Sequence, residues 1–393
     1  MLFQSVDNKK FVGVYVDGVI HRDRLPEGIN MTWGYCSFLP GDVTYASLYC
    51  KGKSLDEVCP EDLVPRWKRI SGGLRAHLSA CREAQVDLQN ISFLDIIPER
   101  LLLEFCEIKN KITEHVLESY PRPENYDFLF DLERVLADIR SRKINLDLDV
   151  LKPHLVSAHA RAVYKRLKRA GRVVNYDAHK TKTGRLTTKK DSFPILTLNK
   201  TFRQAIMPNN DYFVELDFNA AELRTLLSLL GKEQPTGDIH EWNIKNVYLD
   251  LVTREEAKKR IFAWLYNPES KDHLSNGAYS RDEILDKYWD GEYITTCFGR
   301  KIKADKHHAV NYIIQSTTSD LFLKRAIEVD KILKDRKSYI AFTLHDSLVI
   351  DFSKEDKDLL HRAVEVFQDT DLGSFTINVS VGDNFGEMKR LNL

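Results

Sequence analysis

The sequence predicts an α+β fold in which helices pack around an antiparallel sheet, preceded by an N-terminal α/β domain. Three stretches indicate this class: residues 211–231 change from strand to helix, residues 253–267 have helical spacing, and residues 340–352 form two apolar segments. The chain has 393 residues, of which 43% are hydrophobic and 30% are charged. This composition is typical of a globular chain of two or three domains and excludes a disordered one.

The stretch from Asp211 to Gly231 changes its apolar period halfway along. Residues 212–218 are mainly aromatic and apolar, which predicts a buried strand, and the residues after them have helical spacing up to Gly231. Asp217 therefore ends a strand, and Glu222 lies in the first turns of a helix. A carboxylate at this place is costly unless it is paired or binds a cation, so Asp217 is a cap, an ion-pair partner or a metal ligand.

Residues 340–352, IAFTLHDSLVIDF, contain two apolar segments that meet at His345-Asp346. The pattern predicts a hairpin with Asp346 at its turn. A second carboxylate on a second strand is what a two-metal phosphoryl-transfer site requires, because paired divalent ions lie about 3.5–4 Å apart between converging elements. The alternative is that Asp346 only makes the turn.

In residues 253–267, two basic and then two aromatic residues recur at every fourth position, which places these four side chains in a stripe along one face of a helix. Thr253 is a suitable N-cap for this helix. Two cations followed by two aromatic rings suit a nucleoside triphosphate, with the cations on the phosphates and the rings on the base and sugar. The alternative is a basic amphipathic helix. The stripe consists of Arg254, Lys258, Phe262 and Tyr266.

With these motifs in view, the sequence resembles family A DNA polymerases, the bacterial polymerase I type. The resemblance covers residues 125–393, and the motifs follow the family's order. They are TKTGRLTT (181–188), DFNAAELR (217–224), GDIH (237–240), the helical stripe, FGRKI (298–302), HAVNYIIQSTTSDLF (308–322), LHDSLVID (344–351) and VGDNFGEMK (381–389).

The resemblance implies a right-hand polymerase fold and template-directed extension of a primer 3′-hydroxyl with dNTPs. It assigns two Mg²⁺ ions, replaceable by Mn²⁺, to Asp217 and Asp346. It also assigns Lys258 to catalysis at the leaving group. The implied nucleotide-binding residues are Arg254, Lys258, Phe262, Tyr266, Glu222 and His240, with Glu222 excluding a ribose 2′-hydroxyl. The implied DNA-binding residues are Arg185, Asn311, Gln315 and His345. Local basic clusters add Lys165, Arg166, Lys168 and Arg300 as candidate DNA contacts.

The resemblance and the turn signals divide the chain into three parts. Residues 121–180 are expected to form a short thumb, opened by Pro121-Arg122-Pro123, and residues 181–393 the palm and fingers, with the fingers at about 232–298. Residues 1–120 are expected to form an RNase H-like domain because of the order of their strands and helices. It is expected to be a degenerate 3′–5′ exonuclease because the family's Asp-x-Glu is missing, with Asp17 as the nearest match. An unrelated α/β domain is the alternative. The expected strands are 11–20, 31–38, 43–49 and 86–94, and the expected helices are 63–83 and 98–117.

Charge and cysteine usage add expectations about the surroundings of the protein. The net charge is +0, so a DNA-binding surface must be local, as in the basic cluster at 165–172. The six scattered cysteines, the absence of a signal peptide and the absence of an apolar run of membrane length predict a cytoplasmic protein of a bacterial or phage-infected cell.

The sequence departs from the family at several positions. Ser347 follows Asp346 where the family usually has Glu, so an auxiliary carboxylate is missing. A compact polymerase without an evident proofreading site suggests a phage or mobile-element origin. The short thumb predicts distributive synthesis unless a processivity or replication partner clamps the DNA. Two alternatives remain: a single-subunit RNA polymerase, which Glu222 argues against, and a catalytically weak polymerase-like DNA-binding subunit.

Overall fold

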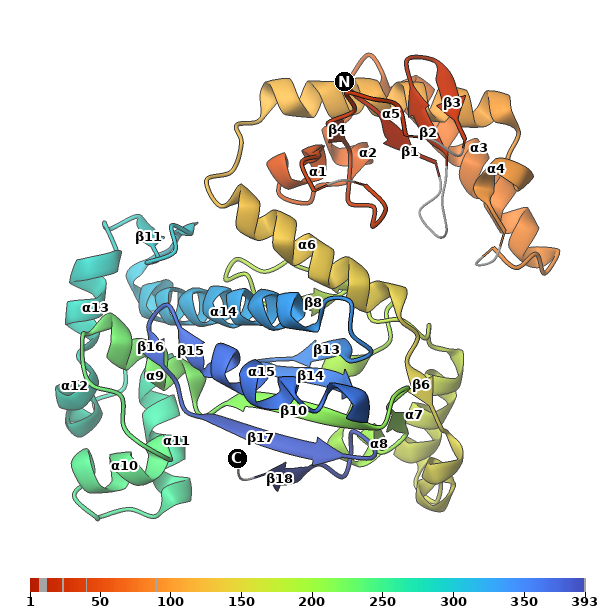
Figure 1. Cartoon of the computed structure of the whole chain (residues 1–393). Coiled ribbons are helices and arrows are strands. Elements are labelled where there is room, and N and C mark those ends of the chain that lie inside the picture. The colour runs from red at the N-terminus through yellow and green to blue at the C-terminus, as the bar shows by residue number, and fades with distance from the viewer. Residues whose placement is uncertain (7–12, 23–24, 40, 89–90, 392–393) are drawn as a thin grey trace. The chain divides into compact units, whose positions relative to one another are not determined.

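The computed structural model describes residues 1–6, 13–22, 25–39, 41–88 and 91–391 (Figure 1). The chain divides into two compact units, Met1–Ala137 and Asp138–Leu393. The division falls inside helix α6 (Tyr126–Ser141), whereas the sequence indicated a boundary at residue 121.

The described part of the first unit combines short strands with long helices. Strands β1 (Gln4–Ser5), β2 (Val14–Val16) and β3 (Val19–His21) form an antiparallel sheet, and β4 (Met31–Thr32) pairs in parallel with β5 (Thr44–Tyr45). The helices before α6 are α1 (Ala46–Tyr49), α2 (Leu55–Val58), α3 (Val64–Glu83), α4 (Phe93–Ile96) and α5 (Glu99–Ser119). Trp67 of α3 stacks on Phe105 of α5 with ring centroids 5.4 Å apart.

The two long helices confirm the predictions at 63–83 and 98–117, but the predicted strands are partly wrong. The run at 11–20 turns back at Asp17-Gly18, where φ values of 44° and 88° make a tight hairpin turn, and its first two residues lie outside the described part. The runs at 31–38 and 43–49 keep two strand residues each, and the second continues as α1.

The strand predicted at 86–94 is also wrong in the residues that the structure describes there. Residues 89–90 lie outside the described part, and α4 begins at Phe93. Ser92 caps α4 by accepting a hydrogen bond from the amide of Leu94 at 3.2 Å. A short apolar run does not distinguish strand from helix by its period, and here the cap decides for helix. The described strands therefore do not complete the expected RNase H-like order.

A five-stranded antiparallel sheet organises the second unit. Its order is β13 (Tyr339–Leu344), β14 (Ser347–Phe352), β10 (Tyr212–Phe218), β17 (Ile377–Gly382) and β18 (Lys389–Leu391). The predicted strand at 212–218 and the predicted hairpin at 340–352 are both confirmed. Helices α14 (Lys306–Leu333) and α15 (Leu359–Gln368) pack together and lie against this sheet (Figure 1).

The central strand β10 has one apolar and one polar face. Leu216 and Phe218 are buried, and Phe218 stacks on Phe367 of α15 with ring centroids 4.4 Å apart. Asp217 points to the other face because side chains alternate along a strand. Its neighbours in register are Ser347 on β14 and Asn378 on β17, so all three side chains share that face.

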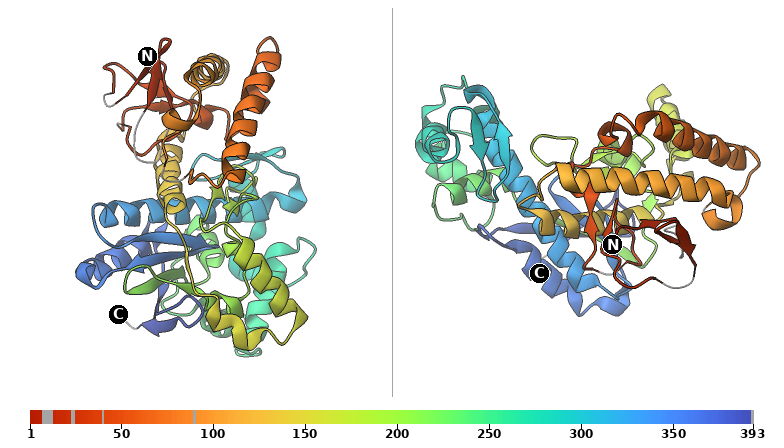
Figure 2. Two further views of the ribbon diagram at one scale, coloured as in Figure 1. Left: turned by 90° about the vertical axis from the view of Figure 1, so that its right-hand side faces the viewer. Right: turned by 90° about the horizontal axis from the view of Figure 1, so that it is seen from above.

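A group of helices lies beyond one end of the sheet (Figures 1 and 2). Its core contains Trp264 and Tyr279, both fully buried. The predicted helix after β10 is confirmed as α9, which is followed by Gly231 at a φ of 66°. The group consists of α9 (Ala221–Leu229), α10 (Ile239–Asn246), α11 (Arg254–Tyr266), α12 (His273–Tyr279), α13 (Arg281–Tyr288) and the hairpin β11 (Tyr293–Thr295) and β12 (Lys301–Lys303).

The segment from the end of α6 to β10 contains one α-helix longer than four residues, α7 (Ala158–Arg169), which has a strongly basic surface. A 3-10 helix (Asp149–His154) precedes α7. The other elements of the unit are β6 (Asn145–Leu146), β7 (Tyr176–Asp177), β8 (Thr187–Thr188), α8 (Lys200–Arg203), β9 (Ile206–Met207), β15 (Asp369–Thr370), β16 (Gly373–Ser374) and 3-10 turns at Ile195–Thr197 and Lys354–Asp356.

Candidate active site

A cavity of about 600 Å³ lies at the polar face of the sheet, where β10 meets α9. Strands, a hairpin turn and two helices contribute to its wall. Its lining includes Asp217, Asp346, Glu222, Phe262, Tyr266, Arg185 and His345, which the sequence singled out, together with Glu215, Arg203, Ser347, Asn378 and Ser380.

Asp217 lies near the end of β10 and has no ion-pair partner among the described residues. Asn378 donates a hydrogen bond of 3.4 Å to its carboxylate. Burial, helped by the nearby carboxylates of Glu215 and Asp346, raises the pKa of Asp217 to about 6 despite that bond. A carboxylate in this state favours a nearby cation, because the cation would remove the cost of its buried charge.

Asp346 occupies the predicted hairpin turn between β13 and β14, which pairs Leu344 with Ser347. Burial raises the pKa of Asp346, while Arg185 and His345 oppose that rise. His345 has a φ of 55°, and Ala220, just before α9, has a φ of 53°. Left-handed backbone at a non-glycine residue costs about 1–3 kcal/mol and is common where a fold must aim functional side chains. Here the two positions flank the segments that carry the two aspartates.

Asp217 and Asp346 fit a magnesium site in the chemistry of their donors. Both offer hard carboxylate oxygens, and neither forms an ion pair in the described residues. The described residues contain no group of three Asp, Glu, His or Cys side chains arranged to enclose a metal ion.

Glu222 joins three elements at the wall of the cavity. It is 5% exposed, accepts a hydrogen bond from the Tyr266 hydroxyl and forms an ion pair with Arg185. Burial raises the pKa of Glu222, and the bonds to Tyr266 and Arg185 limit that rise. The network therefore fixes both the carboxylate and the last turn of α11.

The predicted stripe lies on α11 as expected. Thr253 caps the helix in a capping box with Glu256, which confirms the predicted N-cap. The rings of Phe262 and Tyr266 are parallel within 9°, with centroids 5.9 Å apart. Phe262 and Tyr266 line the cavity, so the aromatic half of the stripe faces the acidic residues. Lys258 is exposed and forms no ion pair in the described residues.

Arg254 is held by Asp238, which lies immediately before α10. The two side chains form an ion pair of 2.6 Å. Burial would raise the pKa of Asp238, but the bonds from Arg254 and from the amides of His240 and Glu241 lower it to about 2. Arg224 in turn fixes this loop by donating to the carbonyls of residues 235 and 237 at 2.9 and 2.6 Å. Arg224 is thus a structural residue that positions the cationic half of the stripe.

The remaining predicted residues lie outside the cavity. Arg300 forms a two-bond ion pair with Asp320 of α14, at 2.9 and 2.6 Å. His240 is 5% exposed, and burial lowers its pKa. The predicted DNA contact of Arg300 and the predicted phosphate contact of His240 stay predictions. Lys165, Arg166 and Lys168 lie exposed on α7, and Asn311 and Gln315 lie half-buried on α14.

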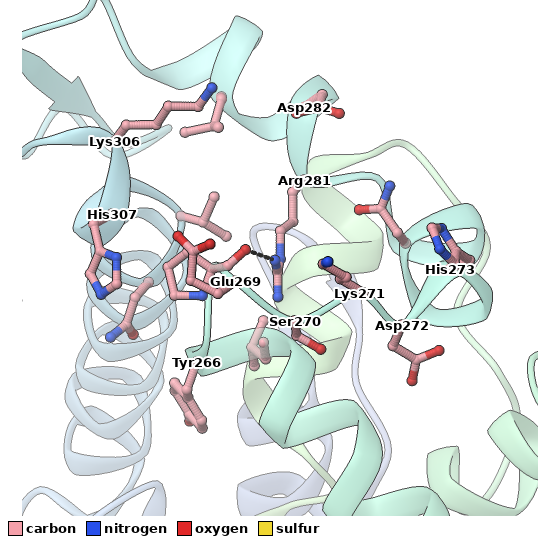
Figure 3. Close-up of a pocket in the computed structure, with 16 residues that line it drawn as sticks. Tyr266, Glu269, Ser270, Lys271, Asp272, His273, Arg281, Asp282, Lys306 and His307 are labelled. Atoms are coloured by element: carbon pink, nitrogen blue, oxygen red, sulfur yellow. Dashed lines mark hydrogen bonds between the residues drawn. The ribbon is translucent and has the colours of Figure 1, made fainter.

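A second cavity of about 600 Å³ begins at Tyr266 (Figure 3). It lies among the end of α11, the loop after it, α12, α13 and the first turns of α14. Arg281 shapes this loop by donating to the carbonyls of Asn267 and Pro268, both at 2.9 Å. Its other charged and polar lining residues include Glu269, Lys271, Asp272, His273, Lys306, His307 and Asn311.

Four lining residues of the first cavity were missed by the sequence interpretation: Glu215, Arg203, Asn378 and Ser380. Glu215 could have been found, because it lies two positions before Asp217 and the period of a strand puts both on one face. The others depend on pairing with β17 and on the chain after α8, which local patterns do not contain.

These features define the class of the protein at the level of its fold: it has the right-hand polymerase fold that the motifs predicted. Among solved structures, it is similar to the POL domain of Pol1 from M. smegmatis in complex with DNA primer-template and dNTP. The TM-score is 0.60 and the identity 15%, and the match covers 88% of this chain and 82% of that chain. No protein-family model and no curated protein matches the sequence. In the described residues, no helix has the length and apolar character needed to cross a membrane.

Proposed function

We propose that this protein is a family A-type DNA polymerase, phage-like in its compactness, that extends a primer 3′-hydroxyl with dNTPs on a DNA template. The observation that carries the proposal is the convergence of Asp217 and Asp346 in a cavity that Phe262 and Tyr266 also line. The polymerase fold supports the same activity. With these substrates, the protein would act in the cytoplasm of a bacterial or phage-infected cell.

Asp217 and Asp346 would hold two Mg²⁺ ions, with Mn²⁺ as a substitute. When bound, the ions lower the pKa of the primer hydroxyl and neutralise the departing pyrophosphate. Asp217 lies on β10 and Asp346 lies in the turn just before the adjacent strand β14, so the sheet would fix the two carboxylates relative to each other. Their rigid placement reduces the reorganisation that the reaction requires.

The incoming nucleotide would lie along α11. Arg254, already oriented by Asp238, and Lys258 hold the triphosphate, with His240 as a further phosphate contact. Lys258 stabilises the charge that develops on the leaving pyrophosphate or donates a proton to it. Phe262 stacks on the nucleotide, and Glu222 excludes a ribose 2′-hydroxyl, because its buried carboxylate fills the cavity wall beside Tyr266.

The primer-template would contact both ends of the second unit. Arg185, His345, Asn311 and Gln315 contact the duplex near the primer end, and Arg300 supports that region. The basic residues of α7 contact the backbone. The cavity beyond Tyr266 would receive the unpaired template strand, because aromatic rings and basic side chains together bind single strands without reading sequence (Figure 3).

We further propose that residues 1–120 are an exonuclease-like domain without proofreading activity, residues 121–180 the thumb and residues 181–393 the palm and fingers, with the fingers at about 232–298. Asp17, the best sequence match to an exonuclease carboxylate, serves the β2–β3 turn and is exposed. Its place in the turn gives it a structural reason to be Asp that needs no metal chemistry.

The test is primer extension with dNTPs or NTPs and Mg²⁺. Asp217→Asn and Asp346→Asn should each lower the extension rate by about a thousandfold, since several kcal/mol of charge stabilisation are lost and each 1.36 kcal/mol is tenfold. DNA affinity, measured by fluorescence anisotropy, should stay within about threefold because the basic surface is unchanged. Preferred use of NTPs by the wild type would point to an RNA polymerase, and no extension at all to a DNA-binding subunit.

A further inference from the structure

Glu215 shares the face of β10 that carries Asp217. Two residues along a strand span about 6.6 Å, so the two carboxylates are neighbours on that face. In register, Glu215 is opposite Val349 of β14 and Ser380 of β17, and Asp217 is opposite Ser347 and Asn378. Glu215, Asp217 and Asp346 all line the same cavity.

Ser347 fixes the Glu215 side chain. Its hydroxyl lies 3.0 Å from Glu215 Oε1 and also 3.0 Å from the carbonyl oxygen of Leu344 in the hairpin. Ser347 is 4% exposed, so this bond is shielded from water. The residue directly after Asp346 thus ties the aspartate hairpin to a third carboxylate on the neighbouring strand.

No basic side chain neutralises Glu215 by an ion pair in the described part of the chain. The charge of Glu215 partly offsets the lowering of the Arg203 pKa by burial, and Arg203 also lines the cavity. Arg203 has other partners: its Nε donates to the carbonyl of Leu198 at 3.1 Å, and its guanidinium lies 5.3 Å from the centroid of the Phe385 ring. Among the described residues, Glu215, Asp217 and Asp346 therefore line the cavity without forming an ion pair to a basic side chain.

We propose that Glu215 is a third acidic residue of the divalent-metal site, held by Ser347, that binds the water shell of the cation beside Asp217. This inference rests on the proposed function. The strand spacing of about 6.6 Å suits one direct carboxylate ligand and one carboxylate that acts through a water, since Mg²⁺ keeps several waters in protein sites. Glu215 is a positioning residue, and its charge raises the affinity of the site for the cation.

The test is Mn²⁺ binding to the full-length protein without DNA or nucleotide, measured from the electron paramagnetic resonance signal of free Mn²⁺. Glu215→Gln should weaken Mn²⁺ binding by about tenfold, as loss of an outer-shell partner typically does. Ser347→Ala should weaken it less, because the carboxylate remains but is no longer held. Glu365→Gln, on the exposed surface of α15, is the matched control and should leave the affinity unchanged.

The outcomes separate this inference from the proposed function. If Asp217→Asn lowers Mn²⁺ affinity while Glu215→Gln behaves like the control, the role of Glu215 is refuted and the metal site stands. If Asp217→Asn also behaves like the control, the metal assignment of the proposed function fails. Circular dichroism checks the folding of each variant. Should Glu215→Gln not fold, Glu215→Asp keeps the charge on a shorter side chain and should lower the affinity by a smaller factor, and unchanged affinity there would also refute the role.

Discussion

Tyr266, at the last turn of α11, donates its hydroxyl to the carboxylate of Glu222, at the first turn of α9. Helix α10 separates α9 from α11 in the sequence. The bond joins the face of α11 proposed to bind the nucleotide to the part of the cavity wall that α9 forms. Arg185 binds the second oxygen of the same carboxylate. The proposed sugar selection therefore depends on a side chain that is fixed from two sides.

Glu222→Ala should raise ribonucleotide incorporation relative to deoxyribonucleotide incorporation by about a hundredfold, a differential of roughly 3 kcal/mol. The reason is that the substitution opens the space proposed to exclude the 2′-hydroxyl. The measurement is the ratio of kcat/KM for a dNTP and the matching NTP. Tyr266→Phe is the control for loss of the hydrogen bond alone and should change the ratio less. An unchanged ratio in Glu222→Ala would refute the proposal that Glu222 excludes the ribose 2′-hydroxyl.

Lys258 and Lys259 offer a matched pair on α11, because both are exposed and only Lys258 belongs to the stripe. Lys258→Ala should lower kcat/KM for dNTPs by about a hundredfold, the usual size of a general-acid contribution. Lys259→Ala should stay within about twofold of the wild type. Single-turnover extension measures both. Equal losses in the two variants would mean that α11 contributes only general positive charge.

Asp217→Asn should stabilise the metal-free protein at neutral pH. The folded-state pKa of Asp217 is raised to about 6, above the ordinary value of 3.8, so the folded protein binds this proton more tightly than the unfolded one. Ionisation of Asp217 therefore lowers the free energy of unfolding of the wild type. This loss is complete above about pH 6 and fades as the pH falls toward 3.8. Asparagine removes this penalty.

The melting temperature in EDTA measures that effect. Asp217→Asn should melt a few degrees higher than the wild type at pH 7.5, and the difference should shrink at pH 4.5. Added Mg²⁺ should raise the melting temperature of the wild type and not that of the variant. A variant that melts lower than the wild type at both pH values would contradict the unpaired state of Asp217.

Synthesis by the isolated protein should be distributive. The proposed thumb has one longer helix after α6, α7, which offers exposed basic side chains but little length with which to enclose DNA. Product length under a heparin trap that permits one binding event should be a few nucleotides, unless a processivity or replication partner is added. Long products from the protein alone would show that another element retains the DNA.

Neutralising Lys165, Arg166 and Lys168 to Gln should weaken DNA binding equally on all sequences. It should reduce the slope of log affinity against log salt by up to about 2.7, since each lost phosphate contact contributes about 0.9. Three exposed basic residues elsewhere, Lys334, Arg336 and Lys357, form a control set whose neutralisation should leave the slope unchanged. Equal effects of the two sets would argue against α7 as a DNA-binding surface.

The first unit should not degrade a mismatched primer end with Mg²⁺ or Mn²⁺. Asp17 makes a hairpin turn, and the described strands do not form the expected exonuclease sheet. Gel analysis of a 3′-labelled mismatch measures this. Degradation that persists in Asp217→Asn and disappears in Asp17→Ala would establish a working exonuclease in the first unit.

The sequence alone determined the features that depend on local patterns. The change of period at 211–231, the polar centre of the hairpin at 340–352 and the four-residue stripe on α11 are properties of single segments, and each predicted element is present. Short segments of the first unit were predicted less well. There the choice between strand and helix depends on caps and packing, as at Ser92 and α4, rather than on period.

Only the tertiary structure decided which residues meet. Strand pairing placed Asn378 beside Asp217. Ser347 stands where the family usually has Glu, and the fold lets its hydroxyl donate a hydrogen bond to Glu215, a carboxylate on another strand. The fold also gave Arg300 a partner in Asp320 and made Arg224 a support for the loop that holds Arg254. A sequence pattern fixes the face on which a side chain lies, but the partner across the sheet or between helices depends on register and packing, which arise from the whole chain.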